Sequence, residues 1–234
     1  MKINPVTIQS AENRFSKFSK DALSTPQMPI RKFTIAQRKC EADYHSIGMI
    51  ETLSDKFAAL VEKLLKVGNL DLAGILCSKL AKFKFLPLEI KEKYIKQGFE
   101  IAEFQNDKMH MIARLEDLHR EYEKQGISEK LRKVLVREES LLKEVISDFD
   151  SSVNNYRTIG NKDKNKDKFQ DLLATTQIDL AKVLLHPDPK KAMKKLKSAI
   201  NILNNLGDTD RCRFAKMLLR MAKENLYGDN YLEF

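Results

Sequence analysis

The stretch from Gly68 to Ala73 most constrains the fold, because it separates two segments with helical apolar spacing. Glycine readily adopts the left-handed backbone that is common just past the end of a helix. Asn69 or Asp71 can cap the following helix, and the small Ala73 lets the two helices approach closely. Looser versions of this turn occur at Gln105-Asn106-Asp107, Ile159-Gly160-Asn161 and Leu206-Gly207-Asp208. The sequence therefore predicts recurrent helical hairpins.

The rest of the chain also favours helices over strands. Only 8 glycines and 6 prolines occur in 234 residues, and β-branched residues form no alternating run. Apolar steps of three and four predict about eight antiparallel helices, near residues 41–67, 71–82, 88–101, 108–125, 128–149, 169–184, 189–203 and 209–226. A charged loop is expected at 160–168, and Asp188 with Pro189 is expected to cap and start the seventh helix.

The first 33 residues show no sustained period and contain three prolines. We expect a disordered basic tail at 1–33, a helical domain at 34–227 and a short tail at 228–234. Within the first tail, Phe15, Phe18 and Leu23 could form an amphipathic patch that docks elsewhere.

Charge and cysteine content indicate the kinds of partner and the cell compartment that we expect. The net charge of +9 is compatible with nucleic acid, an anionic membrane surface or an acidic protein partner. Three widely spaced cysteines, Cys40, Cys77 and Cys212, form no disulfide framework and favour a reducing compartment. No signal peptide or membrane span is evident, so we expect a cytoplasmic protein.

The first hairpin resembles tetratricopeptide-type (TPR) repeats. The matching residues are Phe57, Leu60, Val61 and Leu64 on its first helix, Gly68-Asn69 at the turn, and Ala73, Cys77 and Leu80 on its second. Leu115, Leu118, Tyr122 and Gly126 repeat the first-helix spacing, with His119 at a small position. Ala192, Leu196 and Ala199 resemble a second helix. Glu138 and the unequal spacing of the turns depart from the pattern.

The resemblance implies an irregular right-handed α-solenoid whose concave face binds peptides or helices of protein partners. Such a repeat buries its apolar stripe only by stacking on its neighbours. An irregular helical bundle without a groove remains the alternative fold. The corresponding function is a non-catalytic adaptor or scaffold.

Motifs for chemistry are weak. Asp163 to Asp167 alternates oxygens like a calcium loop, but it lacks the required glycine and the bidentate glutamate. The four histidines are scattered, Cys77 lies on an apolar stripe, and Glu138-Glu139 fits a solvated helix surface. We therefore expect no enzyme activity, no metal and no cofactor.

Basic residues supply the candidate contacts. Lys190, Lys194 and Lys197 share one face of the seventh helix, opposite its apolar stripe. With Arg114 and His119, they are the residues that we expect to bind a partner. The same lysines could track phosphates, so a nucleic-acid-binding protein is the second hypothesis.

His186-Pro187-Asp188 resembles the signature tripeptide of J-domains, which stimulate a chaperone ATPase. Tyr156, Gly160 and Leu180-Ala181 before it, and Leu196, Leu203, Leu206 and Asp208 after it, fit that comparison. The helix that precedes the tripeptide is poor in basic residues, and Pro189 restarts a helix at once. A degenerate J-like co-chaperone is the third hypothesis.

Overall fold

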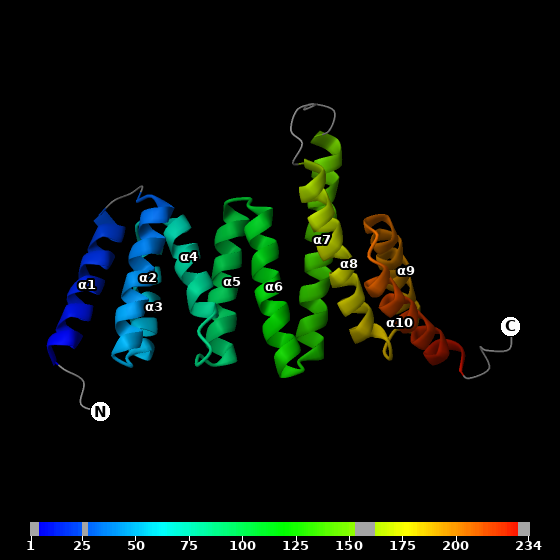
Figure 1. Cartoon of the computed structure of the whole chain (residues 1–234), viewed down its shortest axis with the longest axis horizontal. Coiled ribbons are helices and arrows are strands. Elements are labelled where there is room, and N and C mark those ends of the chain that lie inside the picture. Colours follow the sequence, from blue (N-terminus) through cyan, green and yellow to red (C-terminus); the bar gives the residue numbers. More distant parts are fainter. Residues whose placement is uncertain (1–4, 25–27, 153–161, 229–234) are drawn as a thin grey trace. The chain divides into compact units, whose positions relative to one another are not determined.

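The computed structural model describes residues 5–24, 28–152 and 162–228, and within these ranges the chain is all α-helical (Figure 1). Ten helices lie in these ranges, without any strand, and they pack mostly as adjacent pairs in sequence order. They are α1 (Pro5–Ser24), α2 (Ile30–Ser46), α3 (Ile50–Lys66), α4 (Leu70–Ala81), α5 (Leu88–Phe104), α6 (Lys108–Gln125), α7 (Ser128–Ser152), α8 (Lys162–Leu184), α9 (Pro189–Leu206) and α10 (Thr209–Tyr227). The all-α prediction is confirmed. None of the ten combines the length and apolar character needed to cross a membrane.

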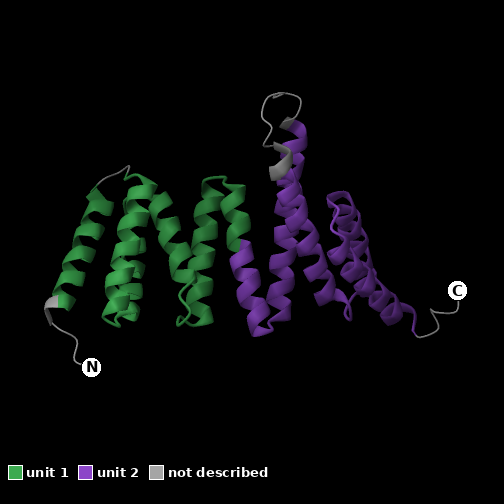
Figure 2. Cartoon of the chain, in the orientation of Figure 1, with its two compact units in different colours: residues 1–114 green, residues 115–234 purple. Residues whose placement is uncertain are grey.

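The chain divides into two compact units, residues 1–114 and 115–234, with the division inside α6 (Figure 2). In unit 1, α1, α2 and α3 pack together, and α4 packs on α2, α3 and α5. In unit 2, α7, α8, α9 and α10 pack in sequence. Most of the expected C-terminal tail, residues 229–234, lies outside the described part of the chain.

The predicted disorder of residues 1–33 is wrong for the part that the structure describes. Pro5–Ser24 form α1, and Ile30 begins α2. The prolines suggested a segment without helices, but two of them lie at helix starts, where proline is tolerated. Pro5 starts α1, and Pro29 is the N-terminal cap of α2. The apolar period of α1 also depends on small residues. Its buried stripe is Ala11, Phe15, Phe18 and Ala22.

The proposed docking patch on this segment is confirmed. Phe15 and Phe18 pack on Phe57 of α3, with ring centroids 6.1 and 6.3 Å apart, and Leu23 packs against the same core. Two polar contacts add to this packing, because Glu12 accepts hydrogen bonds from the Tyr44 hydroxyl and Lys56 Nζ. The α1 helix is therefore part of the core of unit 1.

The single helix expected over 41–67 is also wrong, because Gly48 divides it. Gly48 has a φ of 68°, and Met49 N donates to Tyr44 O at 2.9 Å, which ends α2. The apolar steps continue across this turn from Tyr44 to Ile50, so periodicity alone did not reveal it.

Other boundaries follow the local sequence. The predicted hairpin at Gly68 is confirmed: Gly68 has a φ of 74°, and Asn69 Oδ1 accepts from Leu72 N at 3.5 Å. The predicted Asp188 cap and Pro189 start of α9 are confirmed as well. The expected loop at 160–168 is wrong from residue 162 onward, where α8 begins. Tyr156 and Gly160 lie outside the described residues.

Candidate partner-binding surface

The α9 helix presents a basic face to solvent. Its buried side is made of Ala192, Leu196, Ala199, Ile200 and Leu203. Lys190, Lys194 and Lys197 lie on the opposite side and are exposed. Within the described residues, none of these three lysines has an ion pair or a hydrogen bond. The structure therefore places three of the predicted contact residues together on an accessible surface.

The other two lysines of α9 are held within unit 2. Lys191 Nζ lies 2.8 Å from Asp188 Oδ2, while Asp188 Oδ1 accepts from Lys191 N at 3.0 Å. These hydrogen bonds from Lys191 lower the pKa of the Asp188 carboxyl. Lys195 points inward, where its Nζ lies 2.6 Å from Glu139 Oε2 on α7. Capping at one end and this inward ion pair fix the rotation of α9 about its axis.

The positive charge of the chain is concentrated here. The α9 helix has five lysines and no acidic residue, and α10 has five basic residues against Asp210 and Glu224. The net charge of the whole chain is +9, so the remaining segments nearly neutralise one another. The end of unit 2 is therefore its most basic region.

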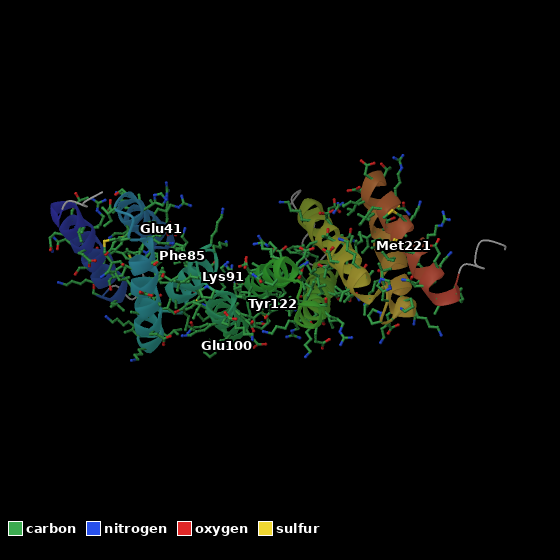
Figure 3. The ribbon with its side chains drawn as sticks, turned by 90° about the horizontal axis from the view of Figure 1, so that it is seen from below. Glu41, Phe85, Lys91, Glu100, Tyr122 and Met221 are labelled. Carbon is green, nitrogen blue, oxygen red and sulfur yellow. The ribbon has the colours of Figure 1, made fainter. Side chains whose placement is uncertain are left out.

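The outer side of α10 is apolar. Phe214, Met217 and Met221 are 40%, 51% and 41% exposed, and the position of Met221 can be followed in Figure 3. Phe214 and Met221 lie on the apolar steps that predict the helix near residues 209–226, yet neither side chain is buried. Small and apolar side chains, Cys212, Ala215, Leu218 and Ala222, form the buried stripe instead. Their spacing of three, three and four was the sequence signal for the true inner face.

Arg114 lies in unit 1, away from this surface in sequence, and is only 8% exposed. It lines a cavity of about 350 Å³ formed mainly by α4, α5 and the start of α6. Gly98 makes room for the Arg114 side chain, since a Cβ at position 98 would lie 3.1 Å from Arg114 Cδ. On the rim of the cavity, Gln105 Nε2 donates to Asp71 Oδ1 and Asp107 pairs with His110.

His119 is largely buried between two carboxylates of unit 2. Its Nδ1 lies 3.6 Å from Glu138 Oε2 on α7, and its Nε2 lies 3.7 Å from Asp179 Oδ2 on α8. Burial alone lowers the pKa of His119, but the hydrogen bond and charge of Glu138 and the charge of Asp179 outweigh it. The pKa therefore lies above its ordinary value. His119 holds helices together inside unit 2.

The expectation that Glu138 and Glu139 are solvated is wrong, because they are 1% and 4% exposed. Thr176 donates to Glu138 Oε1 at 2.9 Å, and Gln177 donates to Glu139 Oε1 at 3.1 Å. Burial raises the pKa of Glu139, but hydrogen bonds from Lys143, Lys195 and Gln177 lower it by more. The pKa of Glu139 therefore lies below its ordinary value. We call His119, Glu138, Glu139, Thr176, Gln177 and Lys195 the polar layer.

The three cysteines are buried and free. Burial raises the pKa of Cys40 to about 11 and that of Cys77 to about 12. A nucleophilic cysteine needs the opposite shift. Among the described residues, no group of three or more His, Cys, Asp or Glu side chains is arranged to hold a metal ion.

The His186-Pro187-Asp188 segment joins α8 to α9. His186 and Pro187 are exposed, and Asp188 forms the cap described above. Helix capping therefore accounts for Asp188 and Pro189.

Comparisons of the chain with protein-family models, curated proteins and solved structures give no match.

Proposed function

We propose that this protein is a non-catalytic scaffold that binds a segment of a partner protein through the outer surface of α9 and α10. The observation that carries the proposal is the face of α9 on which Lys190, Lys194 and Lys197 are exposed without an internal ion pair. Surface lysines held by no neighbour keep their charge available for a partner. The inward ion pair of Lys195 supports this role because it keeps the face turned outward.

The proposal includes an irregular right-handed α-solenoid related to TPR repeats. Two observations support it: helices that pack mainly on their neighbours in sequence, and the Gly68 hairpin of α3 and α4. In such an array each helix pair leaves faces that a partner can cover.

Nucleic acid is the second candidate because α9 has five lysines and no acidic residue. Phosphate binding needs clustered cations but no apolar surface. The exposed Phe214, Met217 and Met221 on the neighbouring helix α10 favour a protein instead. The co-chaperone hypothesis remains a prediction, tested by loss of chaperone ATPase stimulation in His186→Gln.

The test is affinity capture from cells that express the protein, followed by mass spectrometry. The variant Lys190→Glu/Lys194→Glu/Lys197→Glu is compared with the wild type and with Lys17→Glu/Lys66→Glu/Lys84→Glu, a control that reverses three exposed lysines of unit 1. We expect partner proteins that resist nuclease, disappear with the α9 variant and persist with the control. Recovery of nucleic acid alone would overturn the proposal.

A further inference from the structure

The packing of unit 2 leaves an apolar stripe on α10 exposed. Phe214, Met217 and Met221 follow one another in steps of three and four, so they share one side of the helix. They extend over about two turns, or about 10 Å. A contiguous exposed apolar patch marks an interaction site more often than single scattered apolar residues do.

The position of α10 in the helix order points to a helical occupant. In unit 2, α8 packs on both α7 and α9, and α9 packs on both α8 and α10. Among the described helices, α10 packs mainly on α9, and Arg211 also ties it to Asp171 and Thr175 of α8. The stripe lies outside the buried residues of α10. A helix that lay along the stripe would occupy the place of a next neighbour in this sequential packing.

Basic residues border the stripe. Arg213, Lys216 and Arg220 are exposed along one side of it, and Lys216 has no ion pair among the described residues. On the other side, Lys182 of α8 places its Nζ 5.5 Å from the Phe214 ring centroid. The face between these cations is apolar. Lys182, Arg213 and Arg220 each pair with a carboxylate of their own helix, so Lys216 is the cation of this border whose charge is not paired among the described residues.

Helix geometry joins the α10 cations to the α9 lysines. The turn between the two helices runs through Gly207 and Asp208, and Asn204 of α9 lies with Arg213 and Lys216 around one surface hollow. Lys197 is two turns before Asn204 and therefore lies on the same side of α9. The basic border thus continues from α10 onto the lysine face.

Resting on the proposed function, we infer that the partner segment is an amphipathic helix that packs its apolar side on Phe214, Met217 and Met221 and pairs acidic flanking residues with the cations of α9 and α10. Methionine side chains adapt their shape to a partner helix. A helix in this position is recognised by anchors at steps of three and four. Two copies of α10 would instead bring like charges together, so self-association is disfavoured.

The inference is tested with the full chain and two synthetic peptides of about five turns each. Both peptides carry leucines at the same helical steps, one with glutamates and the other with lysines at the flanking positions. Fluorescence anisotropy measures their binding at low and high salt. We expect the acidic peptide to bind at least about tenfold more tightly than the basic one, with a difference that narrows as salt increases.

Variants separate the apolar and charged contributions. Met217→Gln/Met221→Gln is expected to weaken binding of the acidic peptide at least about tenfold, because it removes two central apolar anchors without changing the charge. Lys194→Glu/Lys197→Glu/Lys216→Glu is expected to weaken it about threefold to tenfold, mainly at low salt. Met109→Gln, at an exposed methionine of α6, is the matched control and should bind like the wild type.

Equal binding of the two peptides, or no effect of Met217→Gln/Met221→Gln, would overturn the inference. So would a short DNA duplex or an anionic vesicle that binds this surface more tightly than the acidic peptide, or a dimer that depends on Met217. If the peptide fails while lysine-dependent partner proteins are still captured from cells, the amphipathic-helix inference falls and the proposed function stands. If both experiments fail, the proposed function falls as well.

Discussion

In unit 1 the side chains buried in α1, α2 and α3 are mainly apolar, with Gln37 and Ser54 as the polar exceptions, whereas α6, α7 and α8 of unit 2 bury ionisable groups between them. Phe18 packs 5.0 Å from Phe33 and 6.3 Å from Phe57, measured between ring centroids. In the polar layer of unit 2, His119 lies between Glu138 and Asp179, and Glu139 binds Lys195. Apolar packing depends little on pH, but a buried charge is stable only while its partner is present and ionised.

The comparison has a functional consequence. Unit 1 is held mainly by apolar surface, and its partly exposed ion pairs of Lys56 with Glu12 and of Lys79 with Glu41 add to this packing. In unit 2 the ion pair between Glu139 and Lys195 fixes α9, and the remaining lysines of α9 then face solvent. Through this ion pair, the polar layer inside unit 2 determines which side of α9 faces solvent.

The largest expected effect is that of Phe57→Ala in unit 1. Phe57 is fully buried and contacts Phe15, Phe18 and Phe83, so its loss leaves a cavity. We expect the free energy of unfolding of unit 1 to fall by about 3–5 kcal/mol. Hydrogen exchange measured by mass spectrometry should show faster exchange in α1 to α4 and no change in α8 to α10. Equal acceleration in both regions would contradict the separate cores.

Glu139→Ala is expected to have the next largest effect, and in the other unit. It leaves Gln177 and the partly buried Lys195 without their carboxylate acceptor. The expected loss is about 2 kcal/mol, confined to α7 to α9. Glu144→Ala on α7, an exposed position, is the reference variant. An unchanged exchange rate in α9 would show that Lys195 does not anchor this helix.

Gly68→Ala tests a backbone effect without a packing effect. An added Cβ would meet no atom within 4 Å, but the φ of 74° disfavours any residue other than glycine. We expect a loss of about 1 kcal/mol, independent of pH and limited to unit 1. Urea unfolding at two pH values measures it. A pH-dependent loss would be inconsistent with a purely conformational origin.

The smallest expected effect is the change in the stability of unit 2 with pH that His119 causes. Its pKa is raised in the folded protein, so its stabilising contribution is complete below the unfolded value and is lost as pH rises through the folded value. Glu139 acts in the opposite direction, because its lowered pKa makes its contribution disappear as pH falls through the folded value. Unit 2 should therefore be most stable between these two transitions.

His119→Gln should remove the loss of unit 2 stability that accompanies rising pH. His186→Gln, at an exposed histidine, should leave that loss unchanged. Urea unfolding across neutral pH measures both variants. The same alkaline slope in His119→Gln as in the wild type would contradict this role of His119.

Features that depend on residues close together in the sequence were predictable, whereas those that depend on distant residues were not. Gly68 and Asp188 act on backbone groups within four residues, and both were predicted correctly. The burial of Glu138 depends instead on Thr176, which is 38 residues away in the sequence and is not apparent from local periodicity.

The same distinction applies to α1 and α10. The phenylalanines of α1 are apparent in the sequence as a patch, but the stripe also depends on Ala11 and Ala22, so a helical period was not predicted there. On α10 the apolar steps include the large side chains of Phe214 and Met221, but the side that packs on α9 is formed by Cys212, Ala215, Leu218 and Ala222. The exposed lysines of α9 were predictable because they lie opposite a clear apolar stripe.

The central claim is that the outer surface of α9 and α10 contacts a protein. A photo-crosslinking residue placed at Lys194 of the full chain, with a matched one at the exposed Lys84, tests it in cells that express the protein. The account predicts a nuclease-resistant protein adduct at position 194 and none at position 84. A nuclease-sensitive adduct at position 194, or no adduct there, would contradict it.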